Sequence, residues 1–369
     1  MILYFLILSY LNLNIFYCNN KCINNFMIYL NEINKKDILI IEINNYHGEC
    51  IPGYIKYFNM IGYKNIDILI TPELYNQTIL DFNYFKYKIK YLIFPKQDID
   101  LFISLGMCDF YKICLFNTIE VGKLKMREYL YSNHKFKSII VLHNKYNLNK
   151  ILYNFNNIVV LKKFKDDLPF YEVNPHYFGE YDLHKKSKII NFITAGDYAV
   201  GRKNFDLLIN SINKLIKNNI ANFHVTIVGL GFGKLENSIK NNDLTKYLTF
   251  TGRISYSLMY KYISKSDFFL PLLDPNKHKR YLIEKTSGSF QLSYGFNIPM
   301  IIDKTFAKIY NFNDNNSIIY DKNENFDKKL IEAINMREEE YKKIKEGLKI
   351  KAREIEKNSL ENLKIILSK

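Results

Sequence analysis

The sequence contains no tryptophan and only six arginines among its 369 residues, whereas Ile, Asn, Lys, Tyr and Phe are abundant. This is the composition of an AT-rich coding sequence, so composition alone says little about function. The five cysteines are odd in number and lie in a long chain, which predicts no disulfide framework and favours a reducing compartment. No G-x-S-x-G elbow is present, so a catalytic triad has no support.

The net charge of +15 comes mostly from Lys and is spread along the chain. No compact basic tract or nucleic-acid-binding motif stands out, so we expect no nucleic-acid partner. The charge is that of a solvated Lys-rich surface, and it also suits attraction to an anionic membrane or a nucleotide substrate. Cys18 and Cys22 lack a second close pair and the histidines are scattered, so we expect no zinc site.

Residues 1–17 form a long apolar run. No Lys or Arg precedes it, as a secretory signal would require, and Asn12 and Asn14 interrupt it. Three interpretations stay open: a weak membrane anchor, a packing extension, or a start codon placed too far upstream. Residues 23–35 predict a short amphipathic helix. We expect a cytoplasmic protein, with peripheral contact to the inner face of the membrane as an alternative.

From residue 37 the pattern alternates between strand and helix. Residues 37–44 predict a buried strand, 46–53 a turn, and 54–61 a helix capped by Gly62. Such a βαβ unit predicts a parallel sheet whose ligands bind at the carboxyl ends of its strands. Further strands are predicted at residues 66–71, 90–94, 113–116, 138–143 and 158–161.

The second half repeats this rhythm. It predicts a strand at residues 189–194, a helix at 205–217, strands at 223–228 and 248–250, a helix at 257–263 and a strand at 267–272. A polar turn then opens a helical run at 290–294 that Gly295 closes, and a strand follows at 300–302. Ser287, Gly288 and Ser289 start this run, where free backbone N–H groups and the helix dipole favour an anion. Residues 327–369 are charged and have helical spacing.

Two neighbouring cations, Arg202 and Lys203, follow the first strand of the second half. Arg binds two phosphate oxygens at once and Lys is a compact charge, so the pair suits a diphosphate, with a solvated cationic turn as the alternative. Gly229, Gly231 and Gly233 follow the next strand, too closely spaced for a G-x-G-x-x-G motif. They predict close approach of the backbone to a nucleotide, or a plain tight turn.

Two further patterns occur in the first half. Asp98 and Asp100 form a bare D-x-D, which either holds a metal on a donor diphosphate or opens a helix. His47, His143 and His176 lie at or after strands or in a turn. A single histidine is usually structural, but three at these places make one functional histidine a reasonable expectation.

Together these residues resemble a retaining, nucleotide-sugar-dependent glycosyltransferase of the "glycosyl transferases group 1" type (family 4-like), over residues 37–369. Residues 195–204 resemble the family's G-R…K-N loop, which implies that Lys203 and Arg202 hold the donor diphosphate. Asp197 stands where the family usually has its first Arg. Residues 225–231, with Gly229 and Gly231, and residues 250–255, with Gly252 and Arg253, resemble the segments that bind the nucleotide.

In the first half, His47 and Gly48 resemble the loop near donor phosphate and acceptor, and His143 resembles the histidine that faces the transferred sugar. The family also has two glutamates spaced E-x7-E around a phosphate turn. Glu284 matches the first, which binds donor-sugar hydroxyls and which we count with His143 as catalytic. Leu292 occupies the place of the second, and the neighbouring Gln291 is a candidate ribose ligand.

The resemblance implies an α/β protein with the GT-B fold, two Rossmann-like domains facing a cleft, with C-terminal helices. The expected boundaries are 1–36 for the apolar extension, 37–185 for the acceptor domain, 186–325 for the nucleotide-sugar domain and 326–369 for the helices. It implies transfer from a UDP- or GDP-type donor to a glycan or lipid-linked acceptor in surface polysaccharide synthesis, without cofactor or metal. Two alternatives stay open: a nucleotide-sugar 2-epimerase of the same fold, and a non-catalytic scaffold that binds a glycan or partner protein.

Overall fold

The structure is a computed structural model that describes residues 15–17, 36–81, 85–118, 135–144, 157–164, 169–182, 186–196, 202–229, 244–321 and 325–369. Most of the apolar extension, the amphipathic helix predicted at 23–35, and Asp197, Gly231 and Gly233 lie outside these ranges. The chain forms two compact units. One comprises Met1–Pro175 and Ser359–Lys369, and the other comprises His176–Asn358.

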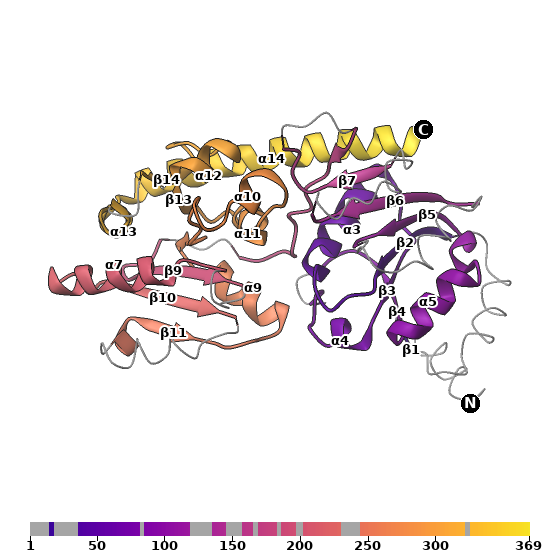
Figure 1. The fold of residues 1–369 in the computed structure, drawn as a ribbon, viewed down its shortest axis with the longest axis horizontal. Coiled ribbons are helices and arrows are strands. Elements are labelled where there is room, and N and C mark those ends of the chain that lie inside the picture. Colours follow the sequence, from indigo (N-terminus) through magenta and orange to yellow (C-terminus); the bar gives the residue numbers. More distant parts are fainter. Residues whose placement is uncertain are drawn as a thin grey trace. The chain divides into compact units, whose positions relative to one another are not determined.

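A parallel sheet forms the centre of the first unit (Figure 1). Its eight described strands lie in the order β1-β4-β3-β2-β5-β6-β7-β8. The predicted strands are found as β2 (Lys36–Glu42), β3 (Ile66–Ile70), β4 (Lys90–Ile93), β5 (Tyr111–Phe116), β6 (Lys137–Leu142) and β7 (Ile158–Val160). Two strands that were not predicted form the edges. β1 (Ile15–Tyr17) pairs with β4, so the end of the apolar extension joins the sheet, and β8 (Tyr171–Glu172) pairs with β7.

Helices connect these strands. A 3-10 turn, η1 (Gly48–Cys50), leads into α3 (Ile51–Ile61), which ends at Gly62 with φ 115°, as predicted. The others are α4 (Pro72–Tyr75), α5 (Lys96–Ser104) and η2 (Met107–Phe110). Asp98 lies in the first turn of α5, so the D-x-D opens a helix. Ile99, Phe102 and Ile103 of α5 belong to the same buried apolar cluster as Leu39 and Ile41 of β2, which anchors α5 on one face of the sheet.

The second unit has a parallel sheet of six described strands in the order β11-β10-β9-β12-β13-β14. The strands are β9 (Ile190–Ala195), β10 (Phe223–Val228), β11 (Leu248–Phe250), β12 (Phe268–Phe269), β13 (Met300–Asp303) and β14 (Ser317–Tyr320). The helices are α7 (Phe205–Lys217), η5 (Leu244–Lys246), α9 (Tyr256–Ser264), α10 (Arg280–Ile283), α11 (Gly288–Phe296), α12 (Lys304–Ile309) and α13 (Phe326–Asn335). The predicted helix at 205–217 and strands at 223–228 and 248–250 have the observed bounds.

Two predictions in this unit were wrong. The strand predicted at 267–272 is only Phe268–Phe269, because the chain leaves the sheet and Leu272 has a left-handed φ of 52°. Gly295 does not end α11, which continues to Phe296 and is capped by Asn297 at φ 51°. A Cβ on Gly295 would lie 2.4 Å from the His176 carbonyl oxygen, so this glycine allows the close approach of residues 176–178 to the helix.

The chain ends in one long helix, α14 (Glu338–Ser368), in agreement with the predicted helical C-terminus. The Tyr341 hydroxyl near its start donates to the Asp267 carbonyl of the second unit at 3.0 Å. Near its end, Ser359 Oγ accepts from the Asn174 N–H of the first unit at 3.0 Å. Across the described residues, no helix combines the length and apolar character that a membrane span requires.

Candidate active site

Each sheet has a topological switch point, where the connections that leave two neighbouring strands run to opposite sides of the sheet. In the first unit the chain runs from β2 outward to β3 and β4, then returns to β5 on the other side of β2. In the second unit it runs from β9 to β10 and β11, then continues with β12 on the other side of β9. Ligands of parallel α/β sheets bind beyond the carboxyl ends of strands at such points. Polar side chains gather at both.

Lys203 lies at the switch point of the second unit. Its Nζ donates to the Pro271 carbonyl, which follows β12, at 2.9 Å, and it lies 3.4 Å from Ser289 Oγ in α11. Its aliphatic chain packs beside Gly196 at the end of β9, where a Cβ would lie 3.4 Å from Lys203 Cε. Three segments that are distant in sequence therefore fix the position of one ammonium group.

Among the described residues, this ammonium group has no acidic partner. Burial lowers the pKa of Lys203 to about 7, because desolvation penalises the charged form. Within the described part of the chain Lys203 makes no ion pair. The pKa of Lys285 is also lowered, mainly by burial and secondly by the positive charges of Arg280 and Arg202. The loop thus concentrates positive charge that a bound anion would stabilise.

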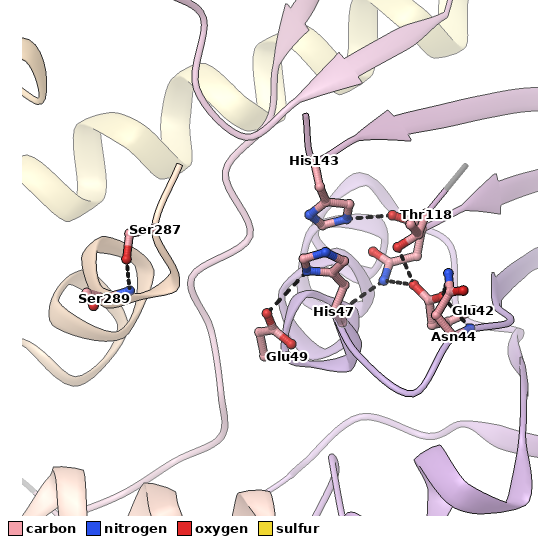
Figure 2. Close-up of polar contacts among 9 residues, drawn as sticks. Glu42, Asn44, His47, Glu49, Thr118, His143, Ser287 and Ser289 are labelled. Atoms are coloured by element: carbon pink, nitrogen blue, oxygen red, sulfur yellow. Dashed lines mark hydrogen bonds and ion pairs between the residues drawn. The ribbon is translucent and has the colours of Figure 1, made fainter. Parts of the chain in front are cut away.

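The start of α11 adds backbone donors to this place. Ser287 caps the helix, and its Oγ accepts from the Ser289 N–H at 3.3 Å (Figure 2). A Cβ added to Gly288 would meet nothing within 4 Å, so open space borders the first turn. The first turn of a nine-residue helix and the Lys203 ammonium are thus the kind of groups that suit an anion. The structure brings together the predicted Lys203, Ser287, Gly288 and Ser289, while the Arg202 side chain is exposed to solvent.

Glycines end three adjacent strands of the second unit at this edge. Gly196, Gly229 and Gly252 have φ values of 131°, 145° and 69°, which favour glycine. Gly196 N–H donates to the Val228 carbonyl at 3.0 Å, and Gly229 N–H donates to the Gly252 carbonyl at 3.1 Å. The predicted Gly229 and Gly252 therefore lie side by side just beyond the carboxyl ends of their strands. Arg253 follows Gly252 and is exposed.

The two positions of the glutamate motif have different surroundings. Glu284 is buried and accepts from Arg280 Nε at 2.5 Å, so any sugar hydroxyl would share this carboxylate with a guanidinium. Leu292 is 7% exposed and Gln291 is 2% exposed, both within α11. The position of the absent second glutamate therefore contributes to the core of the unit.

Two histidines stack at the switch point of the first unit (Figure 2). The rings of His47 and His143 lie 3.7 Å apart, centroid to centroid, with 9° between their planes. His47 precedes η1 with φ 65°, and its Nδ1 lies 3.6 Å from Glu49 Oε1. Burial raises the pKa of Glu49, but the hydrogen bond and charge of His47 outweigh it and lower that pKa to about 2. Glu49, which the sequence analysis missed, is therefore a carboxylate beside His47.

The protonation of His143 follows from its contacts. Its Nε2 lies 2.7 Å from the Asn117 carbonyl oxygen, which can only accept, so Nε2 carries the proton. Burial and the neighbouring His47 lower the pKa of His143 to about 3, so the ring is neutral at physiological pH. Nδ1 is then an acceptor, and this side of the ring can receive a hydrogen bond from a hydroxyl group.

Glu42, also missed from the sequence, lies at the end of β2 in the same cluster. It is fully buried, and burial raises its pKa to about 7 against the opposing effect of hydrogen bonds from Thr118, Asn44 and Asn117. A single acidic residue that ends an apolar strand, in the run DILIIEIN, was the available signal. Its partners could not be identified, because Asn117 and Thr118 follow another strand.

Two other predicted residues have packing roles. A Cβ on Gly48 would lie 2.6 Å from Ile79 Cδ1 and 3.0 Å from Leu74 Cδ1, so a larger residue there would have to displace the ends of these two side chains. His176 is buried, with its ring edge-on to Tyr294 at 5.9 Å between centroids. In the described ranges, no three His, Cys, Asp or Glu side chains are grouped as metal ligands.

Comparisons with known proteins agree with this architecture. No known family matches the sequence, and no curated protein matches it either. Among solved structures, a glycosyltransferase from Rickettsia africae is 13% identical with a TM-score of 0.59, over 90% of this chain and 98% of its own. HepE from Anabaena, solved with UDP and glucose, is 12% identical with a TM-score of 0.60, over 90% of this chain and 100% of its own.

A third similar structure is a variant of S. aureus TarM with fondaparinux, α-GlcNAc-glycerol and UDP. It is 14% identical with a TM-score of 0.50 over 71% of this chain, which spans only 56% of TarM. At these identities the likeness concerns the fold. The two parallel sheets and the C-terminal helix are those of the GT-B fold, as the sequence predicted.

Proposed function

We propose that this chain is a glycosyltransferase that moves a sugar from a nucleoside-diphosphate sugar to a hydroxyl group of an acceptor. The observation that carries the proposal is Lys203, a desolvated ammonium held between the Pro271 carbonyl and the first turn of α11. A cation with no acidic partner in the described residues, placed at a helix N-terminus, suits a diphosphate. Arg202 adds an exposed second cation to the same loop.

The nature of the donor follows from this site and from the comparisons. HepE and the TarM variant were solved with UDP, which supports a UDP-type donor, with a GDP-type donor as the alternative. Gly229 and Gly252 carry no side chain at the ends of two neighbouring strands and would let the nucleoside approach the backbone. Gln291 and Glu284 remain the candidates for ribose and donor-sugar hydroxyls.

The reaction breaks the bond between the sugar C1 and the diphosphate oxygen, whose electron pair stays with the leaving diphosphate. Lys203 and the α11 amides would stabilise this charge as it develops. In the retaining route the acceptor oxygen bonds to C1 on the face that the diphosphate leaves, and its proton passes to a diphosphate oxygen. This route needs no side-chain base, metal or cofactor.

The first unit would supply the acceptor side. His143 Nδ1, an acceptor in the neutral ring, would receive a hydrogen bond from a sugar or acceptor hydroxyl, with His47 and Gly48 beside it. We propose a glycan or lipid-linked acceptor and a role in surface polysaccharide synthesis, with the protein in the cytoplasm and in peripheral contact with the membrane.

The proposal is tested with a panel of UDP-, GDP- and ADP-sugars, measured by calorimetry and by NMR of the products. We expect binding of one nucleotide class, and product formation only after an acceptor such as a glycolipid or oligosaccharide is added. Conversion of the donor into an epimer without any acceptor would show that the chain is a 2-epimerase and not a transferase. Absence of affinity across the panel would contradict both enzymes and favour a scaffold.

A further inference from the structure

A buried carboxylate lies in the first unit, next to the two stacked histidines. Glu42 ends β2, whose residues 38–41 are apolar and buried, and its own side chain is 0% exposed. An apolar side chain here would continue the core and would avoid the cost of burying a charge. Packing alone therefore does not account for this glutamate.

Four donors surround the Glu42 carboxylate (Figure 2). Oε1 accepts from the Asn44 backbone N–H at 2.8 Å and from Asn44 Nδ2 at 2.9 Å. Oε2 accepts from Asn117 Nδ2 at 2.7 Å and from Thr118 Oγ1 at 2.6 Å. Both oxygens accept in these four bonds, as in the ionised form, and a protonated carboxyl keeps the network when the Thr118 hydroxyl turns to accept. Glu42 thereby joins the loop after β2 to the loop after β5.

The contacts of Asn117 extend this network to His47. Its Nδ2 also donates to the His47 carbonyl at 2.8 Å, so the amide N–H₂ group lies between two acceptors. Reversing the amide would place Oδ1 against both of them, which fixes the orientation. Oδ1 is buried and has no hydrogen-bond partner among the residues that the structure describes, which costs free energy. The side chain of Asn117 therefore keeps this orientation because its Nδ2 donates to Glu42 and to the His47 carbonyl.

The backbone of the same residue holds the other histidine. The Asn117 carbonyl accepts from His143 Nε2 at 2.7 Å, which sets the tautomer of His143. We propose that Glu42 is a positioning residue that, by fixing Asn117, sets the separation of His47 and His143 and the tautomer of His143. It does not touch the substrate. The catalytic consequence rests on the proposed function, whereas the positioning itself does not.

The first unit contains a matched control for a buried acid. Asp67 on β3 is 5% exposed and accepts from Lys36 Nζ and, at 2.8 Å, from the Tyr111 hydroxyl. It belongs to the same sheet and contacts neither histidine in these bonds. Asp67→Asn therefore removes a buried carboxylate, with its effect on stability, but leaves the Asn117 network intact.

The positioning is tested by NMR of the imidazole nitrogens in the full chain, with His143 assigned through His143→Gln. In the unmodified protein we expect His143 as a single Nε2–H tautomer. Glu42→Met should convert this signal into an averaged or shifted one, and Glu42→Gln should do so less, since the Thr118 hydroxyl can turn to accept. Should Glu42→Met fail to fold, Glu42→Gln carries the test. A His143 tautomer unchanged in every folded Glu42 variant, or changed equally by Asp67→Asn, would overturn the proposal.

The catalytic consequence is tested by steady-state kinetics with the donor found in the panel above. We expect kcat to fall at least tenfold in Glu42→Met, while the nucleoside diphosphate affinity stays unchanged, because the proposed diphosphate site belongs to the second unit. Asp67→Asn should keep its kcat. A Glu42→Met enzyme with normal kcat would overturn the proposal. If even the unmodified chain turns over no donor, the proposed function fails, and the NMR result still decides the role of Glu42.

Discussion

Lys203 Nζ lies 3.4 Å from the hydroxyl oxygen of Ser289, a residue 86 positions further along the chain. One residue follows the first strand of its sheet and the other begins a helix after the fourth, so only the folded topology joins them. The pair combines a desolvated cation with helix N–H groups. Two of the predictions below depend on this relationship.

Lys203→Met should weaken nucleoside diphosphate binding about 10- to 100-fold, because a hydrogen bond to a charged group contributes about 1.5–3 kcal/mol. The fold should remain, since Met retains most of the aliphatic contact beside Gly196. Calorimetry measures the effect. Lys308→Met on α12, where the lysine is exposed, is the control and should bind normally. Equal affinity in both variants would refute the diphosphate assignment.

Affinity for a nucleotide sugar should fall as the pH rises above about 7. Lys203 has a lowered pKa of about 7 in the free protein, and a bound diphosphate favours its charged form. Binding then takes up a proton above pH 7, so affinity decreases by up to roughly tenfold per pH unit. Both phosphates of a nucleotide sugar are diesters of constant charge, so the ligand adds no such slope.

Calorimetry in buffers of different ionisation enthalpy measures this proton uptake. Lys203→Arg keeps its charge throughout this range and should bind with a flat pH profile. A slope that persists in this variant would assign the titration to another group.

Gly295→Ala should destabilise the second unit by about 1–3 kcal/mol, as expected for an overpacked site. Its new Cβ would lie 2.4 Å from the His176 carbonyl oxygen and 2.5 Å from the Phe178 ring. Gly288→Ala in the same helix meets nothing within 4 Å and should be neutral or stabilising by up to about 1 kcal/mol. Urea denaturation of the two variants compares them, and equal midpoints would contradict this packing.

Local, uninterrupted patterns were readable from the sequence. The helix Phe205–Lys217 has apolar residues at helical spacing, and Phe223–Val228 is a short apolar strand before a glycine. Repetition of such units predicted two Rossmann-like halves, and the resemblance to group 1 glycosyltransferases implied the GT-B fold. The edge strand β1 was not readable, because its partner β4 lies more than seventy residues away.

The candidate site was only partly readable for the same reason. Lys203 and the Ser287 turn were recognised from their own neighbourhoods. The strand predicted at 267–272 stops early because Leu272 adopts φ 52°, and no glycine at this position indicates the turn. The same loop presents the Pro271 carbonyl to Lys203. Glu42 was missed because its hydrogen-bond partner Asn117 lies 75 positions away in the sequence. Sequence reasoning finds chemical groups, but their partners depend on how distant strands pair.

The stability of the first unit should fall as the pH rises from about 4.5 to 7. Glu42 has a raised pKa of about 7 in the folded chain, against an ordinary value of 4.5. Between these values the folded state binds more protons than the unfolded state, so unfolding becomes easier with increasing pH and levels off above 7. The shift corresponds to roughly 3 kcal/mol.

Urea denaturation of the full chain across this pH range measures the effect. Glu42→Gln cannot ionise and should remove this part of the slope, while Asp67→Asn should retain it. The contribution of Glu49 has the opposite sign, because its stabilisation is lost as the pH falls from about 4.5 towards about 2. The effects of Glu42 and Glu49 on stability therefore occur in different pH ranges. A Glu42→Gln profile that matches the unmodified chain between pH 4.5 and 7 would mean that another group titrates there.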